Sequence, residues 1–260
     1  MKRLSFVAGV ALAIAAAGPV TAADEAKITV FAAASLREAF EAAAPAFTKR
    51  TAVAVTFSFG GSDTLVTQLK QGAPADVFAS ANDAQMKVAV DAGLIVAPAR
   101  TLAHNHLVVI VPKDNPAKIT GLPDLAKPGV KVVLAALTVP VGGYSRSAFH
   151  KLNGQSGYGA DYESLVERNV VSNELDVKAV ATKVSLGEAD AGVVYATDAT
   201  PLIADRVKAI GFPPRASPDA TYPIAALKGA PNPSGARAFV DFLLSPEGQA
   251  FLKARGFASP

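Results

Sequence analysis

The sequence predicts an α/β protein with mostly parallel sheets flanked by helices. Short apolar strands alternate with helical patterns along the chain, and such alternation is typical of parallel sheets. Half of the 260 residues are hydrophobic and 18% are charged, which excludes a disordered chain. The length allows one large core or two smaller ones, because single cores stop growing near about 250–300 residues.

The predicted strands are short and apolar. Residues 107–111 contain no polar position, as expected for a strand that is covered on both faces. The other strands are predicted at residues 27–33, 53–59, 76–80, 130–136 and 191–195.

The predicted helices follow apolar spacing and end at glycines. The first has one apolar face, and we expect Pro45 to kink or shorten it. A helix around Leu65 and Leu69 ends near Gly72, and the helix of residues 82–92 ends at Gly93. Two further helices are predicted at residues 234–244 and 246–255. The two clearest helix faces are Leu36, Phe40, Ala43 and Phe47, and Val177, Val180, Ala181 and Val184.

The N-terminal segment has the features of a cleavable export signal. Lys2 and Arg3 precede an apolar stretch, residues 4–17, that is too short for a stable spanning helix. Small residues allow cleavage after Ala22 or Ala23. We therefore expect residues 1–23 to be removed and the mature protein to be soluble and exported.

Charge and cysteine content exclude several classes of protein. The formal net charge is +3 and falls to +1 without the basic residues of the signal. A nearly neutral chain without a basic run predicts no nucleic-acid partner. The absence of cysteine excludes disulfides, thiolate metal sites, a cysteine nucleophile and a lipoprotein anchor.

Three turns between a predicted strand and a predicted helix carry hydroxyls or glycines, at residues 32–36, 59–65 and 138–144. Ser35 occupies a predicted N-cap, with Glu38 three residues later as in a capping box. Ser62 occupies the next predicted N-cap. Free N–H groups and a partial positive charge make a helix N-terminus an anion site. The alternative is that both serines merely cap helices.

Glycines in these turns would allow the backbone to approach a ligand. They are Gly60, Gly61, Gly142 and Gly143. Two proline-rich passages, residues 112–128 and 213–223, indicate where the chain crosses between two lobes.

Enzyme motifs are absent from the sequence. His104 and His106 could form half of a metal site, but there is no HExxH motif and no second histidine pair. Neither a GxSxG elbow nor a Walker motif occurs. A secreted serine hydrolase that uses His104, His106 or His150 stays as an alternative, and Tyr195 alone is more typical of a core residue.

Four segments together resemble the periplasmic molybdate-binding proteins of ABC importers. They are ITVFAAASL at 28–36, QGAPADVFASA at 71–81, VPVGGYSR at 139–146 and ADAGVVYATDA at 189–199. The resemblance extends over nearly the whole mature chain. It implies a two-lobed, type II-like periplasmic binding protein with a ligand cleft between the lobes. The first lobe is then expected to comprise residues 24–106 plus 218–260, and the second residues 107–217.

The resemblance also implies an oxyanion site made of five residues. The hydroxyl donors fall on Ser35 and Ser62, the backbone donors on Val141 and Val177, and the cleft tyrosine on Tyr195. Asp63 stands where the family often has another small hydroxyl residue. A carboxylate beside a dianion is repulsive unless it turns outward.

The implied function is binding of molybdate, and of tungstate, for delivery to an ABC permease. Both ions are dianions without protons at neutral pH, and a site built only from hydrogen-bond donors suits them. Phosphate carries a proton and needs an acceptor. Binding proteins for sulfate, chromate or phosphate on the same fold stay as alternatives. We expect a monomer that is not an enzyme, that has no cofactor and no direct metal-ion ligands, and that holds molybdenum only as the bound oxyanion.

Overall fold

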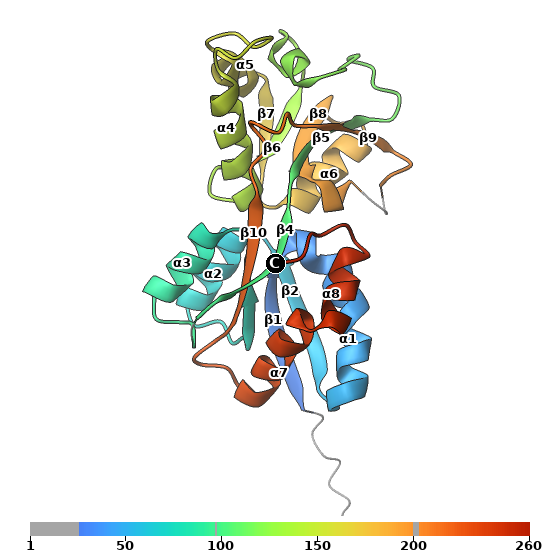
Figure 1. The fold of residues 1–260 in the computed structure, drawn as a ribbon. Helices are drawn as coiled ribbons and strands as arrows, with labels where there is room; N and C mark the ends of the chain where they lie inside the picture. The colour runs from blue at the N-terminus through green and yellow to red at the C-terminus, as the bar shows by residue number, and fades with distance from the viewer. Residues whose placement is uncertain (1–25, 97, 200–202) are drawn as a thin grey trace, which may run out of the picture.

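The protein consists of two five-stranded sheets, each flanked by helices, and this confirms the predicted α/β class (Figure 1). The computed structural model describes residues 26–96, 98–199 and 203–260, so the expected signal of residues 1–23 lies outside the described residues. We call each sheet with its helices a lobe. Among the described residues, no helix is both long and apolar enough to cross a membrane.

The first lobe contains the N-terminal and C-terminal parts of the described chain. Its sheet has the order β2-β1-β3-β10-β4, with strands Ala54–Gly60, Lys27–Ala33, Val77–Ala79, Ala220–Ala226 and Arg100–Asn105. Its helical segments are η1 (Ala34–Leu36), α1 (Arg37–Thr51), α2 (Ser62–Lys70), α3 (Asp83–Asp91), α7 (Pro233–Leu244) and α8 (Pro246–Lys253).

The second lobe contains the middle of the chain. Its sheet has the order β7-β6-β8-β5-β9, with strands Val170–Glu174, Val132–Ala135, Ala191–Tyr195, Leu107–Pro112 and Val207–Gly211. Its helical segments are η2 (Leu122–Ala126), α4 (Pro140–Leu152), α5 (Tyr162–Arg168), α6 (Val177–Ser185) and η3 (Ala196–Asp198).

Both sheets are mixed but mostly parallel, as predicted. In each sheet one strand, β10 in the first and β5 in the second, is antiparallel to its neighbours. The carboxyl ends of the parallel strands therefore lie at one edge of each sheet. In sheets of this kind ligands bind outside the carboxyl ends of the strands.

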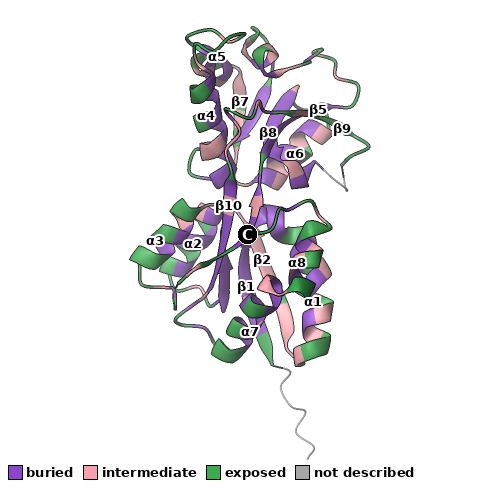
Figure 2. Ribbon diagram, in the orientation of Figure 1, coloured by how far each residue is buried: buried purple, intermediate pink, exposed green. Residues whose placement is uncertain are grey.

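The core of each lobe is formed by the apolar faces that the sequence indicates. Every residue of β5 is buried, and so is the predicted face of α1 (Figure 2). Phe40 and Phe47 of α1 pack edge-on against Phe239 of α7, with ring centroids 5.9 and 5.1 Å apart. Aromatic pairs in this geometry contribute beyond the area that they bury.

Pro45 does not shorten α1, contrary to that part of the prediction. The helix continues to Thr51, and both Pro45 and Glu41 are exposed. The carbonyl that loses its helical partner is that of Glu41, four residues earlier, and on this face water can solvate it.

The lobes are connected near the middle of the molecule. His106 joins β4 to β5, and residues 212–219 join β9 to β10. The second proline-rich passage, residues 213–223, thus lies where the chain changes lobe. The first, residues 112–128, does not, because it joins β5 to β6 within the second lobe. The prolines of residues 112–128 therefore lie in a connection within one lobe and not where the chain passes between lobes.

Candidate functional site

A small pocket lies between the lobes, at the carboxyl ends of β1, β2, β6, β7 and β8. It encloses about 210 Å³ of empty space, including its mouth. Because this figure includes solvent at the mouth, the enclosed space is smaller still, so the pocket suits a small ion and not a drug-sized ligand. The complete lining is Ala33, Ala34, Ser35, Gly60, Gly61, Ser62, Ala81, Val139, Pro140, Val141, Asp176, Val177 and Tyr195.

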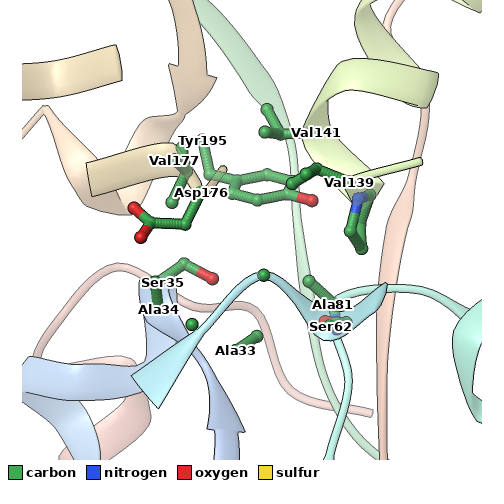
Figure 3. Close-up of a pocket in the computed structure, with 13 residues that line it drawn as sticks. Ala33, Ala34, Ser35, Ser62, Ala81, Val139, Val141, Asp176, Val177 and Tyr195 are labelled. Carbon is green, nitrogen blue, oxygen red and sulfur yellow. The ribbon is translucent and has the colours of Figure 1, made fainter. Parts of the chain in front are cut away.

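All five predicted site residues line this pocket. Ser35 and Ser62 come from the first lobe, on one side in Figure 3, and the other three come from the second lobe, on the opposite side. None is more than 4% exposed. The register of the first sheet explains why Ser35 and Ser62 lie close together. Ala33 at the end of β1 pairs with Gly60 at the end of β2, and the two serines follow these residues in the chain.

Ser35 does not form the predicted capping box. It lies inside the short helix η1, and Leu36, not Ser35, precedes α1. Its Oγ lies 2.9 Å from the hydroxyl of Tyr222 in β10. When Tyr222 donates this bond, the proton of Ser35 is available for a ligand. Glu38 has a different partner, Lys178 of the second lobe.

Ser62 also has a different role from the predicted cap. It is the first residue of α2, and Gly61 is the N-cap. Its Oγ accepts a hydrogen bond from the N–H of Ala81, 3.1 Å away. A hydroxyl that accepts one bond still has its proton to donate. Ser62 is thus oriented as a donor by a residue of the same pocket.

The hydroxyl of Tyr195 is buried and has no hydrogen-bond partner among the described residues. In Figure 3 the ring lies along the second-lobe side of the pocket, with its hydroxyl toward Val139. Burial raises the pKa of Tyr195 well above its usual value of 10, and the neighbouring Tyr222 acts in the same direction. The hydroxyl therefore keeps its proton at neutral pH. A buried, unpartnered donor at a pocket wall indicates a ligand that accepts its bond.

Three helix N-termini meet at the pocket. Ser62 is the first residue of α2, Val141 the second of α4 and Val177 the first of α6. N–H groups at these positions have no acceptor within their own helix. The positive ends of three helix dipoles thus act on one small volume, an arrangement that favours an anion.

Asp176 is a pocket residue that the sequence reasoning missed. It is the N-cap of α6, and its Oδ1 accepts a hydrogen bond from the N–H of Ala179 at 3.0 Å. The sequence signal was present, because an aspartate immediately precedes the apolar face that starts at Val177. Asp176 is the one charged residue in the lining, which contains no lysine or arginine.

Ala81 and Tyr222 were missed as well, and here no local signal could have revealed them. Ala81 orients Ser62 from 19 residues away, and Tyr222 contacts Ser35 from 187 residues away. Both contacts depend on which strands become neighbours in the first sheet.

Asp63 lies outside the pocket lining. Its Oδ2 accepts a hydrogen bond from the hydroxyl of Thr138, 2.7 Å away in the second lobe. The repulsion that a carboxylate facing a dianion would cause is avoided by this orientation.

The glycines of residues 59–65 and those of residues 138–144 differ in what they lie against. Gly60 and Gly61 line the pocket as predicted, whereas Gly142 and Gly143 do not. A Cβ at Gly142 would lie 2.0 Å from the carbonyl oxygen of Ala136, so this glycine allows α4 to approach the chain that follows β6. The close approach is to protein backbone and not to a ligand.

The histidines take no part in this pocket. His104 pairs with Asp219, and His150 pairs with Glu163. No described serine forms a hydrogen bond with a histidine in this structure. Within residues 26–96, 98–199 and 203–260, no group of three or more histidine or acidic residues could hold a metal ion.

Comparison with known proteins gives consistent results. Residues 28–258 match the family model described as bacterial extracellular solute-binding protein. The chain is 40% identical over 245 residues to the molybdate-binding protein ModA of Mycobacterium tuberculosis, covering 94% of this chain and 88% of that protein. It is 36% identical over 263 residues to ModA of Escherichia coli, covering 98% of each.

A solved structure supports the fold. The periplasmic molybdate-binding protein of Azotobacter vinelandii superposes with a TM-score of 0.74 at 22% identity, covering 90% of this chain and 99% of that chain. At this level of identity the likeness concerns the fold alone.

Proposed function

The chain belongs to the bacterial extracellular solute-binding proteins, and within them to the molybdate-binding group. On this premise we propose that it binds molybdate between its lobes and delivers it to an ABC permease. One observation carries the proposal. Uncharged donors from both lobes surround one small pocket: the hydroxyls of Ser35, Ser62 and Tyr195 and the N–H groups of Val141 and Val177.

The donor set matches the chemistry of the ion. Molybdate has no proton to give at neutral pH, so every bond to it must be donated by the protein. Hydrogen bonds to a charged acceptor contribute roughly 1.5–3 kcal/mol each. Several such bonds and three helix N-termini can hold a dianion without a lysine or arginine. Tungstate has the same charge and no protons, and we propose that it binds as well.

The wider proposal follows from the family and the sequence. The protein acts by binding and not by catalysis, needs no cofactor, and works as a periplasmic monomer after removal of residues 1–23. Residues 24–106 plus 218–260 form one moving lobe and residues 107–217 the other. A ligand that contacts both lobes favours the form in which they are closed around it, which the permease recognises.

One feature of the pocket favours a second candidate, a phosphate-binding protein. Asp176 brings a carboxylate to the lining, and a carboxylate can accept the proton that phosphate carries. One oxygen of Asp176 is already used by Ala179, which leaves the other. Competition between the two anions separates the candidates.

Titration calorimetry and thermal unfolding of the mature protein test the function. We expect molybdate and tungstate to bind, and sulfate, chromate and phosphate to compete weakly. Molybdate at 100 times its Kd should add about 2.7 kcal/mol of stability. An unchanged melting temperature with molybdate, or tighter binding of phosphate, would contradict the proposal.

Serine substitutions test the site. Ser35→Ala and Ser62→Ala should each weaken molybdate binding by about 1–3 kcal/mol, because the anion loses one donor. Ser145→Ala is the matched control, since Ser145 is also buried but bonds only the carbonyl of Val141 within α4. If Ser35→Ala and Ser62→Ala bind molybdate as tightly as Ser145→Ala, the two pocket serines have only a structural role.

A further inference from the structure

An ion pair joins the lobes beside the pocket. The Nζ of Lys178, in α6 of the second lobe, lies 2.8 and 2.9 Å from the two carboxylate oxygens of Glu38 in α1 of the first lobe. The same Nζ lies 2.9 Å from Oδ1 of Asp198, in the second lobe. One lysine thus connects a residue of its own lobe to a residue of the other.

This cluster is largely shielded from water. The side chains of Lys178, Glu38 and Asp198 are 25%, 15% and 0% exposed. Burial acts to lower the pKa of Lys178, but the carboxylates of Asp198 and Glu38 outweigh it and raise the pKa. Lys178 therefore stays charged, and salt screens a partly buried pair less than an exposed one.

The cluster is adjacent in sequence to two proposed anion donors. Lys178 follows Val177, and Glu38 is three residues after Ser35. A bond between Lys178 and Glu38 therefore holds the N-terminus of α6 against η1, and these two elements are in contact. In Figure 3 Ser35 and Val177 both lie toward the left of the view, Ser35 on the first-lobe side of the pocket and Val177 on the second-lobe side.

A second connection between the lobes lies near Ser62 and Val139. Thr138 of the second lobe donates to Asp63 and accepts from Nε2 of Gln85, at 2.7 and 3.1 Å. These bonds are exposed, and exposed polar pairs contribute little. The partly buried contact between Lys178 and Glu38 is the stronger candidate for holding the lobes together.

We propose that the Glu38–Lys178 pair is a clamp that sets how tightly this protein retains its anion. The pair forms only when the lobes are closed, so it stabilises the closed form without touching the anion. Asp198 anchors Lys178 within the second lobe so that the ammonium group projects toward Glu38. This inference rests on the proposed function for the identity of the anion.

A different role for Lys178 gives the opposite prediction. If Lys178 acted mainly by attracting the anion, loss of the negative charge on Glu38 would strengthen binding. If the pair is a clamp, the same change weakens binding. Glu38→Gln therefore distinguishes the two roles by the sign of its effect, and it leaves the pair between Lys178 and buried Asp198 intact.

The test compares Glu38→Gln with Glu174→Gln. Glu174 pairs with Lys183 on the same helix α6, and its side chain is 13% exposed, but both partners belong to the second lobe. With molybdate as the probe, Glu38→Gln should lower affinity by about tenfold or more, mainly through faster dissociation, while Glu174→Gln stays within about twofold of the unaltered protein. Affinity of Glu38→Gln that equals or exceeds that of the unaltered protein would overturn the clamp.

Small-angle scattering without added anion provides an independent readout. Glu38→Gln should have a larger radius of gyration than Glu174→Gln, because more molecules are open. Identical radii for the two variants would overturn the clamp. If the unaltered protein fails to bind molybdate, the proposed function fails, and the comparison of radii still decides whether the pair closes the lobes.

Discussion

Two of the three hydroxyl groups of the pocket are oriented by hydrogen bonds to neighbouring residues, and the third is not. Ser35 is paired with Tyr222, Ser62 accepts from Ala81, and Tyr195 has no partner among the described residues. Leaving a buried polar group unpartnered costs free energy. Tyr195 thus lowers the stability of the protein at a position where a ligand can accept its hydrogen bond.

Tyr195→Phe should separate stability from binding. The variant loses an unpartnered buried hydroxyl, so its free energy of unfolding should be unchanged or higher. Molybdate affinity should fall by about 1–3 kcal/mol because one donor is lost. Denaturant unfolding measures the free energy of unfolding, and titration calorimetry on the same samples measures the molybdate affinity. A variant that is destabilised and still binds at full strength would contradict this role.

At the scale of elements, the approach of the lobes depends on the loop between β2 and α2. A Cβ at Gly61 would lie 2.4 Å from the carbonyl oxygen of Leu175 in the second lobe, whereas a Cβ at Gly60 would have only ordinary contacts, the nearest at 3.7 Å. Two adjacent glycines thus have different constraints, although the sequence predicts the same role for both.

Gly61→Ala should prevent full closure. Overpacked contacts of this kind cost about 1–3 kcal/mol. The Cβ would also lie 2.7 Å from Oδ1 of Asp63, but that is the end of a side chain that can move, whereas the carbonyl of Leu175 is backbone of the other lobe. The cost should therefore fall on molybdate affinity, because it opposes the approach of the two lobes. Gly229→Ala is the control, because Gly229 lies outside the pocket lining and a Cβ there would meet nothing within 4 Å, and it should bind nearly as tightly as the unaltered protein. Calorimetry of the two variants measures the difference, and equal affinities would show that the lobes tolerate the methyl group.

At the scale of the whole molecule, the proposed site has no donor that titrates near neutral pH. Burial raises the pKa of Tyr195 and Tyr222 well above 10, so both hydroxyls keep their protons in the folded protein. In the unfolded chain tyrosine loses its proton near pH 10. The folded state therefore binds more protons than the unfolded state above this pH, and stability falls as pH rises.

Two pH profiles should follow from these pKa values. Molybdate affinity should be flat between about pH 7 and 9, because no tyrosine donor is lost there. The free energy of unfolding should decrease above about pH 10. Calorimetry and urea unfolding across this range check both. A loss of affinity centred near pH 8 would show that a titrating group, and not these neutral donors, controls binding.

The amino-acid sequence was sufficient to predict the α/β class, the buried faces and the positions of Ser35 and Ser62 at strand ends, because periodicity and turn chemistry are local properties. It also determined family membership through segments that match known relatives. It could not determine the bonds of Ser35 to Tyr222, of Ser62 to Ala81 or of Glu38 to Lys178. These partners are 187, 19 and 140 residues apart, and only strand order and the packing of the two lobes bring them within hydrogen-bonding distance.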